Sequence, residues 1–298
     1  MVGESHMSSV KNAAIFEEMK AGPTRAELAA RSSYDLGVLV ECAYEMYEKD
    51  PGNLRPALPA NFPAGRYDVI SYILFSDFFD GGWTQRFYGL FVEDKTAPNT
   101  YVIAIRGTQG WEEWWDDFHI LPTRYPAGGM VERGFYEIYK TMAVTPLGAG
   151  ALQDGAAFIK RLEQISAGAA RPAFRFVGHS LGSALANFAA LDAALRIGGS
   201  SDIALTTFAC PLTGDQGFVD VLEANVSDNA RIVNIPDLVP DLPPGMGYVQ
   251  VNTAYFIDSR NFSAISRTYA CYHSLLTYLY CLNPLNPLGL AAACKAAG

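Results

Sequence analysis

The sequence has few of the features that mark several large classes of protein. Its 298 residues carry 22 lysines and arginines against 31 aspartates and glutamates, which gives a formal net charge of −9. Nucleic-acid-binding surfaces need basic patches that neutralise phosphates, so this balance argues against a nucleic-acid partner. It also argues against attraction to anionic lipid, although it says nothing against neutral lipid.

Long apolar runs are lacking as well. No uninterrupted apolar stretch approaches the roughly 18 residues that span a bilayer, so we expect no transmembrane segment. Residues 1–7 hold no apolar core of a signal peptide and are typical of an expression-tag remnant. Because a natural signal peptide can be lost when such a tag is added, secretion is plausible and a cytoplasmic location is not excluded.

Cysteine is scarce and histidine is scarcer. The five cysteines form neither a CxxC pair nor a zinc-site spacing, so we expect no metal site, and no organic cofactor is implied. Cys281 and Cys294 flank a proline-rich tail and are candidates for a disulfide. Buried thiols fit at least as well, and the odd number leaves one cysteine over.

What the chain does contain is an ordered series of apolar segments. Helical spacing over residues 10–50 predicts helix, with a start at Pro23. A turn is then expected over residues 77–85, where Gly and polar residues interrupt the apolar pattern. Three runs rich in β-branched and aromatic residues predict consecutive strands, at residues 67–75, 86–94 and 101–107.

Beyond about residue 136 the patterns of helix and strand alternate. A helical segment ending at Gly168 comes first, and a second helix is expected over residues 180–199. Short apolar runs predict strands at residues 173–178, 203–211 and 230–237. Such alternation indicates an α/β sheet covered by helices on both faces. Since no repeat or linker is visible, we expect residues 8–298 to form a single domain.

The stretch GHSLG lies between a predicted strand and a predicted helix. A serine on such a turn projects its hydroxyl from the C-terminal edge of the sheet, where only small residues fit two positions away. Gly178 and Gly182 are those residues. The start of the helix adds free N–H groups and a positive dipole end, which suit a developing oxyanion. The pattern therefore predicts that Ser180 is a nucleophile.

A serine nucleophile needs a base, usually a histidine oriented by a carboxylate. In an α/β-hydrolase sheet these residues follow the order serine, carboxylate, histidine. His6 and His119 precede Ser180, and His179 adjoins it and is expected to point away. His273 is the one histidine that follows Ser180, so we expect it to be the base.

The carboxylate should follow a strand between the serine and the histidine. Asp237 comes directly after the apolar run of residues 230–235, and prolines on both sides hold its loop. Asp241, four residues further on, is the rival candidate. Three other aspartates fit a position after a strand less well, namely Asp202, Asp215 and Asp228.

Seven segments in a fixed order now resemble the class 3, or fungal-type, lipase family of α/β-hydrolases. YVIAIRGT is similar to the family's strand and RGT turn, WEEWWDDF to W-x-x-D-L, VERGF to H-x-G-F, and GHSLGSA to GHSLGGA. FACPLTGD is similar to FGxPRVGN, NIPDLVP to N-x-x-D-x-V-P, and YHS to the histidine segment. The resemblance implies an α/β-hydrolase fold with a mostly parallel central sheet, flanking helices and a short helical lid. It favours Asp237 over Asp241.

The same resemblance implies an oxyanion hole. Thr108 would supply one donor through its backbone N–H and its hydroxyl, and the backbone N–H of Leu181 would supply the other. A purely structural hydroxyl at Thr108 is the alternative. The sequence departs from the family pattern in that Glu132 replaces a histidine and Ser183 a glycine. Further departures occur in FACPLTGD, at Ala209, Leu212 and Asp215.

Three tryptophans follow the expected oxyanion turn. Trp111, Trp114 and Trp115 share one face if the segment is helical. The match to the family suggests a core position for Trp114. In the lipases that the segment resembles it forms a lid, so we expect residues 109–118 to cover the site, with Trp111 and Trp115 facing the site or a lipid–water interface.

These residues lead to three functional hypotheses. The first is a lipase that hydrolyses acylglycerol esters through an acyl-enzyme on Ser180, with His273 as the proton shuttle and Asp237 as its partner. The second keeps this chemistry but acts on phospholipids, as a phospholipase A1, or on feruloyl or aryl esters. The third is a catalytically silent binding protein, against which the complete set of three residues argues.

Overall fold

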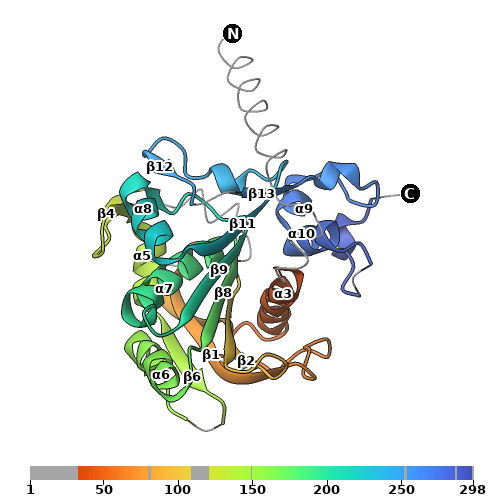
Figure 1. Cartoon of the computed structure of the whole chain (residues 1–298). Coiled ribbons are helices and arrows are strands. Elements are labelled where there is room, and N and C mark those ends of the chain that lie inside the picture. The colour runs from red at the N-terminus through yellow and green to blue at the C-terminus, as the bar shows by residue number, and fades with distance from the viewer. Residues whose placement is uncertain are drawn as a thin grey trace.

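The structure is a computed structural model that describes residues 33–79, 82–108, 121–148, 150–251, 254–285 and 287–296. A nine-stranded sheet runs through its centre in the order β13-β11-β9-β8-β3-β2-β1-β6-β7 (Figure 1). The strands of this sheet are β1 (Tyr67–Phe79), β2 (Gly82–Asp94), β3 (Thr100–Ile105), β6 (Ala143–Pro146), β7 (Gln153–Asp154), β8 (Ala173–His179), β9 (Asp202–Phe208), β11 (Asp228–Asn234) and β13 (Ala254–Ile257).

Five neighbouring strands of the sheet, from β3 to β13, run parallel to one another. The strands β2, β1, β6 and β7 extend the sheet beyond β3 in antiparallel pairs. Parallel strands need crossover connections, usually helical, and their carboxyl ends meet at one edge where ligands bind. The parallel part of the sheet therefore defines the edge at which a functional site is expected.

Helices cover both faces of the sheet (Figure 1). On one face α7 packs against β8, β9 and β3, and is itself flanked by α5, α6 and α8. On the other face α3 lies against β2, β3 and β8, next to α10. The helices are α3 (Ser33–Lys49), α5 (Arg133–Lys140), α6 (Gly155–Gly168), α7 (Leu181–Ile197), α8 (Gln216–Asn225), α9 (Tyr269–His273) and α10 (Leu275–Leu282).

Smaller elements complete the described part of the chain. A second sheet has four short strands in the order β12-β10-β5-β4. These strands are β4 (Pro122–Arg124), β5 (Met130–Glu132), β10 (Gly214–Asp215) and β12 (Tyr248–Val249). Three 3-10 helices are η1 (Val239–Asp241), η2 (Ser259–Asn261) and η3 (Ala292–Cys294).

Helix α7 is buried around almost its whole circumference. Small side chains let it sit between the sheet and three other helices, because each alanine allows a neighbouring backbone to come close. Its fully buried alanines are Ala184, Ala186, Ala189, Ala190 and Ala193. A helix that is apolar on all sides belongs in the interior of a protein. The nucleophile candidate at its N-terminus is thus attached to a helix that is enclosed on nearly all sides.

Two predictions about element boundaries are wrong. The turn expected over residues 77–85 is much shorter, since β1 continues to Phe79 and β2 already starts at Gly82, in pairing that includes Phe78 with Trp83. Aromatic and β-branched residues at the tip favour a long hairpin there. The helical segment before Gly168 starts only at Gly155, because residues 153–154 form β7 and pair with the unpredicted β6.

The cysteines also differ from the prediction. A disulfide joins Cys271 to Cys294, while Cys281 is buried outside it. The suggested pairing of Cys281 with Cys294 is therefore wrong. The bond attaches the C-terminal η3 to α9, the short helix that ends at His273.

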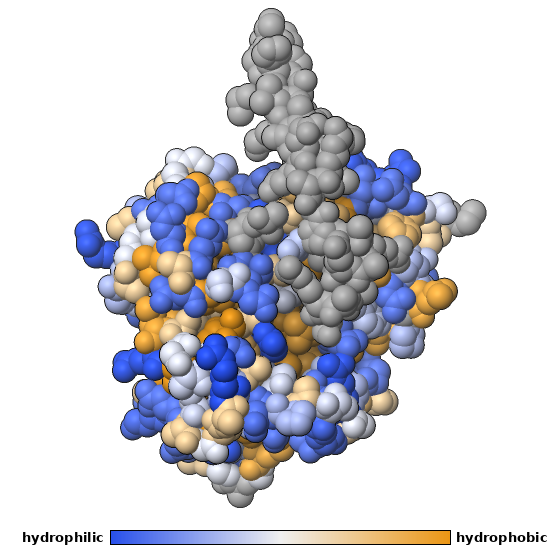
Figure 2. Space-filling view, in the orientation of Figure 1, coloured by the Kyte–Doolittle hydropathy of each residue, from blue (hydrophilic) through white to orange (hydrophobic). Residues whose placement is uncertain are grey.

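Most of the face shown in Figure 2 is hydrophilic, with hydrophobic residues gathered towards its middle. Across the described parts of the chain, none of the helices combines the length and the apolar character that a membrane crossing requires. The helix expected to start at Pro23 lies partly outside the described residues, and α3 forms its later portion. A single domain over residues 8–298 stays a prediction.

Candidate active site

The residues predicted as nucleophile, base and acid come together at the carboxyl edge of the parallel strands. Ser180 occupies the one position between the end of β8 at His179 and the start of α7 at Leu181. Its backbone has φ 56° and ψ −130°, a conformation that is rare for a residue with a side chain. Such strain is found where a fold holds a side chain in place for a function.

The two glycines of GHSLG are required by close contacts. A β-carbon on Gly178 would overlap the carbonyl oxygen of Gly182, and one on Gly182 would overlap the carbonyl oxygens of Ile105 and Arg106. Here β8, the first turn of α7 and the end of β3 approach one another at the level of the backbone. This contact is the physical reason for the motif's spacing.

Ser180, His273 and Asp237 form a continuous chain of hydrogen bonds. Nε2 of His273 lies 2.9 Å from Oγ of Ser180, and Nδ1 of His273 lies 2.9 Å from Oδ2 of Asp237. All three side chains are buried. Since a carboxylate oxygen only accepts, Nδ1 donates to Asp237, and Nε2 is the ring nitrogen placed to accept from the serine hydroxyl.

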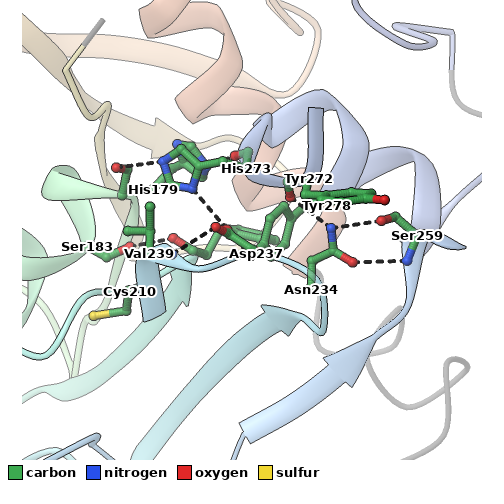
Figure 3. A network of polar contacts seen from close by, with 12 residues as sticks. His179, Ser183, Cys210, Asn234, Asp237, Val239, Ser259, Tyr272, His273 and Tyr278 are labelled. Atoms are coloured by element: carbon green, nitrogen blue, oxygen red, sulfur yellow. Dashed lines mark hydrogen bonds and ion pairs between the residues drawn. The ribbon is translucent and has the colours of Figure 1, made fainter. Parts of the chain in front are cut away.

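Asp237 is held by two further donors. The hydroxyl of Tyr278 on α10 donates to Oδ2 at 2.7 Å, and the backbone N–H of Val239 donates to Oδ1 at 3.0 Å. Figure 3 shows Asp237 between His273 and Tyr278. Burial and the nearby Asp237 charge raise the pKa of Tyr278 well above its usual value, so this hydroxyl keeps its proton. Its role was not predicted from the sequence.

The competing aspartates have other partners or positions. Asp241 ends η1, four residues after Asp237. Asp202 and Asp228 pair with arginines near the amino ends of their strands, and Asp215 caps α8. Of these candidates, Asp237 is the one whose carboxylate bonds His273.

Asn234, at the end of β11, connects the segment of Asp237 to the segment of His273. Its amide nitrogen donates to the carbonyl of Tyr272 at 2.8 Å and to Oγ of Ser259 at 3.0 Å, and its Oδ1 accepts the N–H of Ser259 at 2.9 Å (Figure 3). Tyr272 immediately precedes His273, so the Asn234 side chain holds the backbone beside His273. Asn234 itself lies three residues before Asp237 in the chain. Asn234 is the first residue of NIPDLVP, but the sequence alone does not reveal this contact.

The turn after β3 lies against Ser180. A β-carbon on Gly107 would fall 2.9 Å from the Cβ of Ser180 and 2.8 Å from the carbonyl oxygen of His179. Thr108, the predicted oxyanion donor, follows directly and is buried. Leu181, the other predicted donor, is the first residue of α7, where backbone N–H groups have no partner within the helix. Leu181 thus follows Ser180 in the chain, and Thr108 follows the glycine that approaches Ser180.

Arg106 anchors this turn from inside the protein. Its guanidinium is fully buried and donates to the carbonyls of Phe87 and Gly107. The rings of Tyr47 and Tyr88 cover the guanidinium, with centroids 3.6 and 4.3 Å from its Cζ. A buried cation is stable only when it is bonded and in contact with such groups. The arginine of RGT therefore holds the turn and does not face a substrate.

Two residues that depart from the family pattern have visible local roles. Oγ of Ser183 donates to the carbonyl of Phe208 at 2.9 Å, and the N–H of Ser180 donates to the same oxygen at 3.0 Å. Glu132 caps α5 by accepting the N–H of Phe135 at 2.7 Å, and burial raises its pKa to about 7. Neither departure disturbs the three hydrogen-bonded side chains.

The predicted lid lies outside the described residues. This applies to residues 109–118, and hence to Trp111 and Trp115, and also to His119. Their roles stay predictions.

Comparison with known sequences finds lipases and phospholipases among the related proteins. The sequence profile of the class 3 lipases matches residues 102–246. A lipase of Rhizomucor miehei is 28% identical over 209 residues, which is 65% of this chain and 53% of that protein. Secreted mono- and diacylglycerol lipase A of Penicillium cyclopium is 32% identical over 201 residues, which is 66% of this chain and 59% of that protein. Phospholipase A1-II 4 of Oryza sativa subsp. japonica is 36% identical over 110 residues, covering 35% and 28%. The chain thus spans little more than half the length of the two fungal relatives.

Solved structures share the fold. The native Rhizomucor miehei lipase propeptide complex has a TM-score of 0.59 and 21% identity, covering 92% of this chain and 84% of the other. A variant of MDLA from Penicillium cyclopium has a TM-score of 0.59 and 24% identity, covering 83% and 85%. At these identities the likeness establishes the fold, and the predicted α/β-hydrolase fold is confirmed.

Proposed function

The chain belongs to the class 3 lipase family, and we propose that it is a serine carboxylic-ester hydrolase acting on acylglycerols. The observation that carries this proposal is the unbroken chain from Ser180 through His273 to Asp237, with both distances at 2.9 Å, on a strained turn at a helix N-terminus. The names of the fungal relatives support an acylglycerol as the substrate.

The proposed reaction begins with acylation. Oγ of Ser180 attacks the ester carbonyl carbon while its proton passes to Nε2 of His273. The carbonyl oxygen becomes an oxyanion, which the backbone N–H groups of Thr108 and Leu181 stabilise. When the tetrahedral species collapses, the alcohol leaves with the proton from His273 and the acyl group stays on Ser180.

Deacylation repeats these steps with water. Nε2 of His273 takes a proton from the water, whose oxygen attacks the acyl carbon. Collapse of the second tetrahedral species releases the carboxylic acid and returns the proton to Ser180. Asp237 orients His273 and stabilises the imidazolium that forms twice in each cycle.

A lipid surface as the place of action is supported by exposed apolar side chains close to the acid and the base. Leu238, directly after Asp237, is 49% exposed, and Tyr269, at the start of the helix that ends at His273, is 61% exposed. Large apolar side chains beside a site suit contact with an apolar phase. The net charge of −9 favours a neutral interface over an anionic one.

A phospholipid substrate is the second candidate. It is favoured by the match to a phospholipase A1 at 36% identity, although that match covers 35% of this chain. Both candidates use the same three residues and differ in the alcohol that leaves.

The substrate is tested with purified protein and a panel of esters, comprising neutral glycerides of increasing acyl length, phosphatidylcholine vesicles and a feruloyl ester. We expect the highest kcat/KM on a neutral glyceride. A higher kcat/KM on the phospholipid would show that phospholipid, and not acylglycerol, is the substrate, and the proposed reaction steps would stay the same. No hydrolysis of any ester would contradict the proposed function.

A further inference from the structure

His179 lies directly behind the proposed base and takes no part in the steps above. Its Nε2 lies 2.8 Å from the carbonyl oxygen of His273, and its ring packs on the ring of His273 with centroids 4.8 Å apart and planes at 36° (Figure 3). Nδ1 of His179 lies 2.8 Å from the hydroxyl of Tyr44 on α3. The same hydroxyl accepts the backbone N–H of Gly107 at 2.8 Å.

These contacts determine where the proton of His179 resides. A carbonyl oxygen only accepts, so Nε2 of His179 must donate to it and must carry a proton. Burial and the adjacent His273 lower the pKa of His179 well below its usual value, so the ring is neutral and holds just that one proton. Nδ1 is then an acceptor. The Tyr44 hydroxyl therefore donates to Nδ1 and accepts from Gly107.

This inference rests on the proposed function. We propose that Tyr44 and His179 form a positioning pair, in which one buried hydroxyl holds the oxyanion turn and, through His179, the backbone of the base. Tyr44 fixes the turn at Gly107, immediately before Thr108. His179 passes the same constraint to His273 through a hydrogen bond and a ring contact. Base and oxyanion donors are thereby kept in register with Ser180 from α3, a helix that contributes no catalytic residue.

The same arrangement explains why His179 is no second base although it adjoins the nucleophile. Its single proton is directed to the carbonyl of His273 and its free lone pair to Tyr44. A base needs a lone pair that faces the reacting hydroxyl, and His179 has none to offer. Protonating it would also place a second positive charge beside the imidazolium that His273 becomes during each step.

Two variants separate positioning from packing. The amide nitrogen of a glutamine can occupy the place of Nε2, so His179→Gln keeps a donor for the carbonyl of His273. The amide oxygen of an asparagine replaces only Nδ1, so His179→Asn loses that donor. We expect kcat of His179→Gln, which loses only the acceptor for the Tyr44 hydroxyl, to fall less than that of His179→Asn. The latter should fall roughly 10- to 100-fold with KM nearly unchanged, as for a small displacement of reacting groups.

A change in Tyr44 tests the other half of the pair. Tyr44→Phe removes the hydroxyl and leaves the ring, so both Nδ1 of His179 and the N–H of Gly107 lose their partner. We again expect a fall in kcat of roughly 10- to 100-fold at nearly constant KM. Tyr139→Phe is the matched control. The Tyr139 hydroxyl is also buried and donates to Asp192 of α7 at 2.6 Å, but this pair lies on the opposite face of the sheet from Tyr44. This variant should leave kcat unchanged.

The proton assignment has its own readout, which does not depend on activity. In ¹⁵N NMR of the wild-type protein, the signals lost in His179→Gln identify His179, and we expect its Nδ1 to resonate as an unprotonated ring nitrogen and Nε2 as a protonated one. The opposite tautomer, or equal kcat in the Gln and Asn variants, would overturn the positioning pair. If wild-type protein hydrolyses no ester and fails to react with a fluorophosphonate, the proposed function is what fails, and the NMR result still decides the tautomer.

Discussion

Asp237 shows how much of the site depends on residues that take no part in the chemistry. Its Oδ2 accepts from both His273 and Tyr278, and its Oδ1 accepts from the backbone of Val239. With three donors in place the carboxylate has almost no freedom to rotate. Hydrogen bonds to charged groups contribute about 1.5–3 kcal/mol each, so the Tyr278 hydroxyl is a substantial part of the acid's environment.

Replacing Tyr278 by phenylalanine removes that hydroxyl and keeps the ring. We expect the free energy of unfolding to fall by about 1.5–3 kcal/mol, because the carboxylate of Asp237 loses a buried donor. We also expect kcat to fall by less than in Asp237→Ala, since His273 keeps its own bond to Oδ2. Urea unfolding and ester kinetics measure the two effects, and unchanged stability would contradict the assigned bond.

The raised pKa of Glu132 leads us to expect that the stability of the protein depends on pH. Its pKa is raised by burial to about 7 in the folded protein, against roughly 4.3 in an unfolded chain. Between these values the unfolded chain has lost the proton that the folded protein keeps. The contribution of Glu132 to the free energy of unfolding is therefore largest below about pH 4. It decreases by about 3 kcal/mol as the pH rises to about 7.

The variant Glu132→Gln isolates this contribution, because glutamine does not titrate. Its free energy of unfolding should fall less between pH 4.5 and 7 than that of the wild type, by up to about 3 kcal/mol. Glu163→Gln, which changes an exposed carboxylate on α6, serves as the control and should keep the wild-type slope. Identical slopes in all three proteins would rule out Glu132 as the titrating group.

At the scale of elements, the site depends on the contact of β3, β8 and α7 through backbone atoms. Gly182→Ala would insert a β-carbon against the carbonyls of Ile105 and Arg106. We expect this variant to lose at least 1–3 kcal/mol of stability and nearly all ester hydrolysis, because the turn that carries Ser180 must move. The control Gly65→Ala has open space around its β-carbon and should change neither quantity.

The disulfide acts on the element that carries the base. Cys271 lies two residues before His273, and Cys294 lies in η3, whose neighbour Ser266 donates its N–H to the carbonyl of Cys294 at 2.8 Å. The bond closes a segment of 23 residues, for which chain entropy gives a stabilisation of about 3 kcal/mol.

Cys294→Ser should therefore lower the free energy of unfolding by about 3 kcal/mol. We expect kcat to fall with it, because α9 has only five residues and ends at the base. Calorimetry and kinetics before and after mild reduction of the wild type measure the same two quantities. Full activity in the reduced protein would show that Asn234 and His179 suffice to hold α9.

At the scale of the whole molecule, the sequence predicts features that depend on local patterns, but it does not predict contacts between residues far apart in the chain. Ser180 and Asp237 follow strands, and His273 is the histidine that comes after Ser180, so motif and chain order indicate all three. Tyr44 and Tyr278 carry no such signal, since Tyr44 meets His179 across 135 residues and Tyr278 lies in an apolar helix. Their partners become visible only when α3 and α10 fold onto the same face of the sheet.

Short elements were missed for a related reason. The strands β6 and β7 have four and two residues, too few for any periodicity to appear. They form because β1 offers a pairing edge to β6, and β6 in turn offers one to β7. The sequence predicts too short a hairpin of β1 and β2, because Gly and Asp near its tip indicate a wide turn. The disulfide partner of Cys294 depended on where α9 lies, which spacing alone does not give.

The central claim is that Ser180 is a nucleophile activated by His273. It is tested most directly by reacting the wild type, Ser180→Ala and His273→Ala with a fluorophosphonate and locating the adduct by mass spectrometry. The account predicts one adduct on Ser180 in the wild type, none in Ser180→Ala and strongly slowed labelling in His273→Ala, with ester hydrolysis in Ser180→Ala reduced by a factor on the order of 10⁶. Labelling at another residue, or wild-type hydrolysis by folded Ser180→Ala, would contradict it.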